Sequence, residues 1–290
     1  MVARDFLLDP EVHRWLGGVE PAWTLLDMES LNALRREPSK DNRALRLANN
    51  FTTAEIAASA VTRNTLILLG RAADSDGLKL TATGNLSRTV VAEMVDLFEW
   101  PSFDRAEAFR LHKVVNEPDF LPLFFVRHVA QMAKLVRPYR GSLRATRLGK
   151  EIMSEDRQRA LQAILFHVTF WHADLTYLSR GMHGSWSQRD IGVLLWSLSV
   201  AAADWQPPEK LTRLCTIPVN GVLQASWDTG SLTMEARILR PLLWFGLLEH
   251  RAEKAPDARL AKRRYYRKAP LFDRFFTFDI HTEQPETARH

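Results

Sequence analysis

Apolar side chains between Phe120 and Val136 follow the period of an α-helix, and the segment after them follows the period of a strand. The helical positions at i, i+4, i+7, i+8 and i+11 are Phe125, Val129, Met132, Ala133 and Val136. Tyr139–Gly141 then supplies a turn whose glycine can adopt a positive φ. From Ser142 to Thr146, polar and apolar residues alternate as in a half-buried strand. A helix followed at once by a hairpin is typical of the second half of a winged-helix module.

Residues 52–153 contain the other elements of such a module in the right order. Thr52 and Glu55 have capping-box spacing, which predicts a helix that continues to Ala73. A short strand is predicted at 78–81, and a second helix comes after it and ends before Trp100-Pro101. The expected order is therefore helix, short strand, helix, helix, hairpin.

A second, similar order is predicted near the C-terminus. Ser187–Asp190 resembles a capping box at the start of a buried helix, and Pro241 should kink a later helix or mark its first turn. Leu247–His250 and Arg263–Arg267 are expected to pair as a second, longer wing. The two halves share no repeat at the level of residues.

These patterns predict a mainly α protein with tandem winged-helix modules and short β-hairpin wings. The expected division is a helical N-terminal lead-in (1–50) packed on module one (51–155), then a helical connector (156–186), module two (187–280) and a flexible tail (281–290).

Composition is that of an ordinary globular protein of 290 residues, with 46% hydrophobic and 25% charged residues. Cys215 is the single cysteine, so no internal disulfide can form, and the first twelve residues have no apolar leader segment. The most apolar run, 191–203, contains serines and is too short to span a bilayer. We therefore expect a cytoplasmic protein that does not bind a membrane.

Basic residues are concentrated in the two expected wings, although the net charge is only +5 and the pI about 9.5. Five lie between Arg137 and Lys150, and six of the ten residues of Arg259–Lys268 are basic; neither stretch contains an acid. Such a stretch can follow a phosphate backbone because neutralising phosphates releases bound counterions. The predicted nucleic-acid-binding residues are Arg127, Gln131, Lys134, Arg137, Arg140, Arg144, Arg147, Lys150, Arg263, Arg264, Tyr265, Arg267 and Lys268.

Three segments carry a resemblance to a known group of proteins: LKLTATGNLSRTVV (78–91), KVVNEPDF (113–120) and GSLRATRLGKEI (141–152). Together they resemble the C-terminal part of plasmid-borne ORF-3-like proteins and related uncharacterised bacterial mobile-element proteins. The resemblance implies a winged-helix module and no catalytic residues. This chain departs from that group because we recognise no ORF-3-like domain in the residues that precede these segments, and because its expected wing is richer in arginine.

One histidine-rich group is a candidate metal site: His167, His172, Asp174 and His183. Zinc proteases place two histidines at i, i+4 with a glutamate between them. Here the first pair is at i, i+5, about 140° apart on an α-helix, and the glutamate is missing. We therefore expect ordinary structural histidines, no metal and no cofactor, and Cys215 is expected to be a buried thiol.

The favoured function is binding of double-stranded DNA by a transcriptional regulator or accessory factor of a bacterial mobile element. Arg127, Gln131 and Lys134 are expected to face the groove, and the wing residues to hold phosphates. The alternative is a scaffold or assembly subunit that uses winged-helix modules to bind a protein partner or a second copy of itself. An enzyme is not expected, and a hydrolase built on the histidines is the least favoured class.

Overall fold

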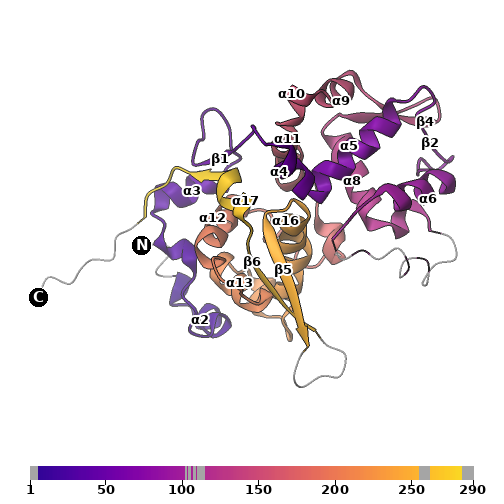
Figure 1. Ribbon diagram of the computed structural model, residues 1–290. Helices are drawn as coiled ribbons and strands as arrows, with labels where there is room; N and C mark the ends of the chain where they lie inside the picture. The colour runs from indigo at the N-terminus through magenta and orange to yellow at the C-terminus, as the bar shows by residue number, and fades with distance from the viewer. Residues whose placement is uncertain are drawn as a thin grey trace, which may run out of the picture. The chain divides into compact units, whose positions relative to one another are not determined.

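The computed structural model describes residues 6–101, 103, 106, 109, 115–254 and 262–282 (Figure 1). It is mainly α-helical with small antiparallel sheets, which confirms the expected class. The chain divides into two compact units: unit 1 contains Met1–Leu47, Asp174–Leu243 and Leu247–His290, and unit 2 contains Ala48–Ala173 and Trp244–Gly246. Among the described residues, no helix combines the length and apolarity needed to cross a membrane.

Unit 2 begins with two helices, α4 (Thr53–Ala58) and α5 (Ala60–Ala73). The predicted capping box is confirmed, because Thr52 accepts from the Glu55 N–H and Glu55 accepts from the Thr52 N–H. The predicted single helix is nevertheless divided at Ser59. Its hydroxyl accepts from the Thr62 N–H at 3.2 Å, so Ser59 caps a new helix where the first one ends.

The remaining elements of unit 2 occur in the predicted order. They are β2 (Leu78–Lys79), α6 (Arg88–Leu97), η2 (Glu117–Asp119), α8 (Leu121–Met132), β3 (Val136–Tyr139), β4 (Ser142–Ala145), α9 (Arg147–Ile152), α10 (Glu155–Gln158), α11 (Leu161–His167) and the π-helical turn η3 (Val168–His172).

The three strands of unit 2 form one antiparallel sheet in the order β2-β4-β3. Leu78 is opposite Leu143, and both side chains are buried, so this side of the sheet faces the core. The next positions along the strands face outward, because side chains alternate between the two faces of a sheet. Helix α8 is buried on most of its surface, and Met132 at its C-terminal end is its most exposed side chain.

Unit 1 combines both ends of the described chain. Its elements are α2 (Pro10–Leu16), η1 (Ala22–Leu25), α3 (Met28–Arg35), β1 (Leu45–Leu47), η4 (Thr176–Ser179), α12 (Ile191–Ala201), α13 (Pro208–Cys215), α14 (Asn220–Leu223), α15 (Thr229–Met234), the π-helical turn η5 (Glu235–Leu239), α16 (Arg240–Trp244), β5 (Leu248–Lys254), β6 (Lys262–Lys268), α17 (Pro270–Phe275) and β7 (Phe276–Phe278). Pro241 lies in α16 directly after the π-helical turn η5, within helical residues that continue from α15 without a break.

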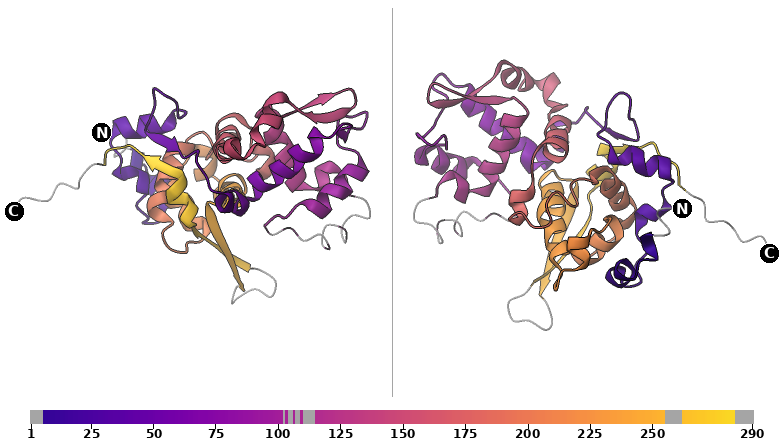
Figure 2. Two further views of the ribbon diagram at one scale, coloured as in Figure 1. Left: turned by 45° about the horizontal axis from the view of Figure 1, so that its top comes forward. Right: turned by 180° about the vertical axis from the view of Figure 1, so that it is seen from behind.

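The strands β5 and β6 pair over seven residues each, and the ribbon they form projects beyond the helices of unit 1 (Figure 2). Gln206 forms an isolated bridge with Tyr266 on the other side of β6. A short extended segment of unit 1 therefore pairs with the second strand of the hairpin, as β2 pairs with β4 in unit 2. The polar loop expected between His250 and Arg263 is described only in part, because residues 255–261 lie outside the described residues, as does most of the expected tail.

The helix that precedes each hairpin ends in a similar way. Before the hairpin of unit 2, Lys134 has a φ of 58° and the Leu135 N–H donates to the Ala130 carbonyl. Before the hairpin of unit 1, Gly246 has a φ of 73° and the Leu247 N–H donates to the Leu242 carbonyl. Such a left-handed residue ends a helix and redirects the chain into the first strand.

The N-terminal segment belongs to unit 1 and not to the module that comes after it in sequence. β1 pairs with β7, the Trp23 indole N–H donates to the Thr216 carbonyl at 3.1 Å, and Arg35 forms an ion pair with Asp190. These partners are more than 150 positions away in the sequence, so local patterns could not reveal them. The domain boundaries therefore differ from the expected ones, and the expected connector is divided between the units at Ala173.

The predicted cap of the buried helix in unit 1 is wrong. α12 begins at Ile191, its N-cap Asp190 makes no side-chain capping bond, and Ser187 has a φ of 67°. The segment before α12 is instead organised by Arg237, which is fully buried on η5. The Arg237 guanidinium donates to the Ser179 hydroxyl and to the carbonyls of Met182, Gly184 and Trp186.

Candidate nucleic-acid interface

The outward face of the three-stranded sheet in unit 2 carries cations on all three strands. Arg137 on β3 is directly opposite Arg144 on β4, and Lys79 on β2 is opposite Ser142. Like charges placed opposite each other destabilise a strand pair. A bound polyanion would offset that repulsion. Lys79 was missed by the sequence patterns, because only the register of β2 against β4 places it on this face.

The turn of the hairpin also presents a cation, as predicted. Arg140 and Gly141 have φ values of 46° and 75°, so both central residues of the two-residue turn adopt left-handed conformations. The guanidinium carbons of Arg137 and Arg140 lie 5.5 and 5.2 Å from the centre of the Tyr139 ring. Tyr139 is 42% exposed, so an accessible aromatic ring lies close to two arginines near the turn of the hairpin.

Lys134 lies at the base of the same hairpin, just beyond the end of α8, and its side chain is exposed. The Thr146 hydroxyl donates to its carbonyl at 2.7 Å, which ties the left-handed residue to the end of β4. In the part of the chain that the structure describes, no acidic side chain forms an ion pair with Lys79, Lys134, Arg137 or Arg140. We call these four residues the sheet cations.

Arg144, Arg147 and Lys150 are placed differently from one another. Arg144 is half-buried and donates to the backbone carbonyl of Asp76 at 3.5 Å. Arg147 and Lys150 lie on α9 and not on the wing. Arg147 forms an ion pair with Glu151 at 2.8 Å, and its hydrogen bond is the main cause of the lowered pKa of that carboxyl.

Arg127 does not face a groove, which corrects the prediction for this residue. It is buried, and its guanidinium forms an ion pair with Glu117 at 2.5 Å. It also donates to the Gly84 carbonyl at 2.7 Å and to the Gln131 side chain at 2.9 Å. The predicted apolar stripe is also wrong at its C-terminal end, because α8 ends at Met132, Met132 is exposed and Val136 lies on β3. Helical spacing could not show that distant segments cover the side of α8 that carries Arg127.

Most of the cations expected in the second wing are neutralised by the protein's own acids. Arg264 forms an ion pair with Glu235 at 2.9 Å, Arg267 with Glu249 at 2.6 Å and Lys268 with Asp273 at 2.8 Å. The sequence window contained no acid because these partners come from η5, β5 and α17. Arg263 remains exposed without an ion pair among the described residues, and Tyr265 is half-buried, 5.3 Å beneath the Arg251 guanidinium.

The histidines are divided between the units. His167 and His172 lie in unit 2 with ring centres 5.2 Å apart, closer than α-helical geometry suggested, because η3 is a π-helical turn. Asp174 and His183 belong to unit 1, where the His183 ring bonds the Thr229 hydroxyl at 2.6 Å. The four residues therefore do not form one cluster within either unit.

A family model described as the Y4jL N-terminal domain matches residues 57–159, which lie within unit 2 and include the whole hairpin. The uncharacterized protein y4jL of Sinorhizobium fredii (strain NBRC 101917 / NGR234) is 29% identical over 109 residues, or 38% of this chain and 49% of that protein. The chain thus spans about half the length of this relative. No solved structure matches the chain. The resemblance to ORF-3-like proteins stays a prediction.

Proposed function

We propose that unit 2 is a winged-helix module that binds double-stranded DNA through the outward face of its sheet. The observation that carries this proposal is that the four sheet cations have no acidic partners among the described residues, and that two of them, Arg137 and Arg140, lie close to the exposed Tyr139 ring. The strand order β2-β4-β3 and the helix order α5, α6, α8 support the winged-helix assignment. Contacts of this kind are made to phosphates, so they position the protein without reading the sequence.

The arrangement of α8 argues for backbone binding and against base reading by this helix. Arg127 is occupied by Glu117, and the partly exposed side chains of α8 include no free cation among the described residues. We therefore expect weak discrimination between duplex sequences and a strong dependence on salt. The further proposal of a regulator or accessory factor of a bacterial mobile element depends on this DNA binding.

The test is fluorescence anisotropy on a random duplex at several salt concentrations, with two variants that remove the same charge. The first changes Lys79, Arg137 and Arg140 to Ala. The second changes Arg71, Arg147 and Arg157 to Ala, three cations of unit 2 that are paired with acids. Each lost phosphate contact lowers the log–log salt slope by about 0.9. The first variant should lose affinity and slope far more than the second.

Equal losses in the two variants would mean that net charge, and not the sheet, causes binding. An unchanged slope in the first variant would reject the interface. Thermal unfolding of both variants shows whether each remains folded, since all six changed residues are at least partly exposed.

A protein scaffold remains the second candidate because one feature of α8 favours it. Met132 is 37% exposed, and Leu121 at the other end of the helix is partly exposed, so this strip offers apolar rather than charged contacts. Copurification of a stoichiometric protein partner, together with no DNA binding at low salt, would favour the scaffold.

A further inference from the structure

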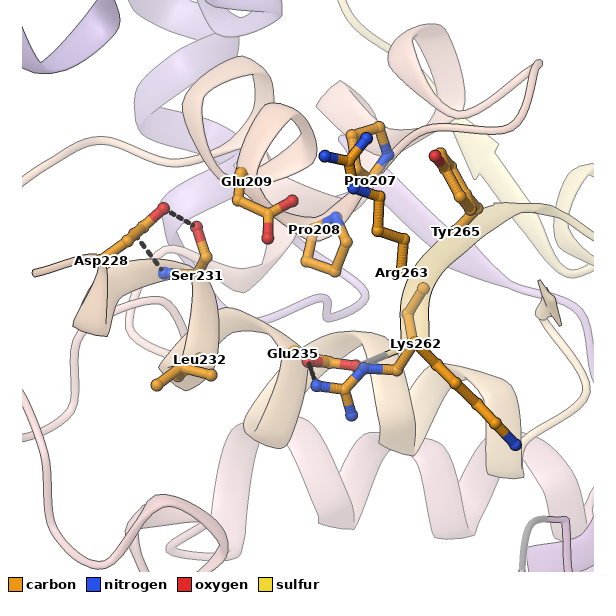
Figure 3. A pocket seen from close by; sticks show the side chains of 11 residues that line it. Pro207, Pro208, Glu209, Asp228, Ser231, Leu232, Glu235, Lys262, Arg263 and Tyr265 are labelled. Carbon is orange, nitrogen blue, oxygen red and sulfur yellow. Dashed lines mark hydrogen bonds and ion pairs between the residues drawn. The ribbon is translucent and has the colours of Figure 1, made fainter. Parts of the chain in front are cut away.

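Unit 1 contains a cavity of about 420 Å³, which lies within the size range of small-molecule sites (Figure 3). Its wall is formed by the start of α13, the start of α15 with η5, and the N-terminal half of β6. Pro208, Leu232 and Tyr265 give it an apolar surface, and charged side chains lie around that surface. None of the residues on the DNA-binding sheet takes part, so this site is independent of the function proposed above.

Two charged side chains of the cavity wall, Glu235 and Arg264, already pair with each other. The buried Glu235 carboxylate accepts from the Tyr266 hydroxyl at 2.7 Å and forms an ion pair with Arg264 at 2.9 Å. Because these two charges cancel, they form a fixed polar wall and do not select the charge of a ligand. Lys262 is also excluded, since its ammonium group points away from the cavity (Figure 3).

Three further charged side chains line the cavity: Glu209 and Arg263, which have no ion-pair partner among the described residues, and Asp228, which is paired with Arg213 at its edge. Glu209 and Arg263 extend toward the same opening in Figure 3. Asp228 caps α15 by accepting from the Ser231 N–H at 3.0 Å and hydroxyl at 2.7 Å. Its carboxylate is 36% exposed, lies 3.9 Å from an Arg213 nitrogen and retains lone pairs for a further donor.

We propose that this cavity binds a basic α-amino acid. Two ammonium groups of the ligand would meet Glu209 and Asp228, its carboxylate would meet Arg263, and its methylene chain would lie on Leu232 and Pro208. Charge suggests the ligand class: a molecule with two positive groups and one negative group complements Glu209, Arg263 and the exposed part of the Asp228 carboxylate, which the long 3.9 Å ion pair with Arg213 leaves open to a further donor. A guanidinium is suited to a carboxylate because it can form two parallel hydrogen bonds to it.

The test is isothermal titration calorimetry of the full chain with L-lysine, L-norleucine and cadaverine. L-norleucine lacks the terminal ammonium group, and cadaverine lacks the carboxylate, so each removes one proposed contact. We expect saturable binding of L-lysine and about tenfold weaker binding of each analogue, since a lost charged contact of about 1.4 kcal/mol is tenfold in Kd. Equal binding of L-lysine and L-norleucine, or no saturable heat with L-lysine, would overturn the proposal.

Three variants assign the contacts. Arg263→Ala should reduce the affinity for L-lysine to that for cadaverine, while leaving cadaverine binding within about twofold. Glu209→Gln should reduce the affinity for both. Lys262→Ala is the matched control on the same strand, and it should change neither. If Lys262→Ala weakened binding as much as Arg263→Ala, binding would reflect general charge on β6, and the site would be rejected.

Discussion

Two basic residues of the hairpin region adopt left-handed backbone conformations that other residue types adopt at lower cost. Lys134 and Arg140 have φ values of 58° and 46°, where a side chain costs roughly 1 kcal/mol that glycine avoids. Both side chains are exposed, so no packing inside the protein explains the choice of lysine and arginine. A backbone conformation that costs free energy is expected to persist where the side chain has a binding role, here a contact of the cation with a ligand.

Lys134→Gly is therefore expected to stabilise the protein by roughly 1 kcal/mol while weakening the DNA binding that we propose for unit 2. Lys134→Ala is the matched control, because it removes the same charge but keeps the Cβ atom. It should weaken DNA binding equally without stabilising the fold. Urea unfolding and anisotropy on both variants separate the two effects. A Gly variant that binds DNA as tightly as the parent would show that Lys134 makes no contact.

His250 is expected to make stability depend on pH. Burial is the main cause of its lowered pKa, with Arg264 also lowering it and Glu235 opposing, and its Nε2 is buried without a hydrogen-bond partner. A histidine whose folded pKa lies below its unfolded pKa contributes stability above the unfolded pKa, near 6.5. That stability is lost as the pH falls toward the folded pKa.

The free energy of unfolding should therefore decrease between about pH 7 and pH 5, and the decrease should be smaller in His250→Phe. His183, whose pKa is also lowered by burial, contributes to the decrease in the same direction. His13→Phe is the control, since His13 is exposed on α2. Identical pH profiles for His250→Phe and the parent, measured by denaturant unfolding, would contradict the assignment.

At the scale of elements, the hairpin of unit 2 was the best predicted part of the fold. Its strands alternate over Ser142–Thr146, and its turn contains a glycine, so two independent local patterns agree. The capping box at Thr52 was also predicted correctly, because its two residues are only three positions apart in the sequence. The predicted helix cap at Ser187 was wrong, because no helix begins at this residue. Hydrogen bonds from Arg237 hold the segment before α12 in a non-helical conformation. The pairing of β2 with β4 places Lys79 on the outward face of the sheet. This pairing joins residues far apart in the sequence, so no local pattern predicts it.

Two glycines of unit 2 are expected to respond to alanine in opposite directions. A Cβ at Gly149 would lie 2.0 Å from the Leu135 carbonyl oxygen, so α9 could not pack on the start of the hairpin. Gly70 is in α5 and has nothing within 4 Å of such a Cβ. Gly70→Ala should stabilise unit 2 by roughly 0.5–1 kcal/mol through helix propensity.

Gly149→Ala should destabilise unit 2 by at least about 2 kcal/mol, because the clash involves backbone and cannot be relieved by a rotamer change. Denaturant unfolding of the two variants compares them directly. A stabilising effect of Gly149→Ala would show that α9 is free to shift away from Leu135. In that case, the close contact would not set the position of the hairpin.

At the scale of the whole molecule, the sequence predicted two similar halves but not which segments build each one. The order of elements could be predicted because helices and strands have local periods. The assignment of β1 to a sheet with β7 could not, since a three-residue strand has no distinctive pattern and its partner is more than 200 positions away. The basic window at 262–268 was misleading for a related reason, because the acids that neutralise it come from other elements.

Unit 2 includes one short segment, Trp244–Gly246, that lies far along the sequence from its other residues. The Trp244 ring lies 5.0 Å from Phe125 and 5.3 Å from Trp100, and the Phe245 carbonyl accepts from the Gln162 side chain at 2.9 Å. Trp244 is buried, so it contributes to the core around α8 although it lies more than 70 positions beyond the rest of that unit. A fragment that ends at Ala173 would lack this part of its core.

Trp244→Ala is therefore expected to destabilise unit 2 by roughly 3–5 kcal/mol, the usual cost of removing a buried large aromatic side chain. Hydrogen exchange measured on peptides of the full chain can locate the effect. Exchange should increase in peptides from α8, because Phe125 on this helix packs against the Trp244 ring. Trp227→Ala is the control, because Trp227 is 61% exposed and its loss should change stability by less than about 0.5 kcal/mol. If exchange in α8 stayed the same, Trp244 would not be part of that core, and residues 48–173 could be expected to fold without it.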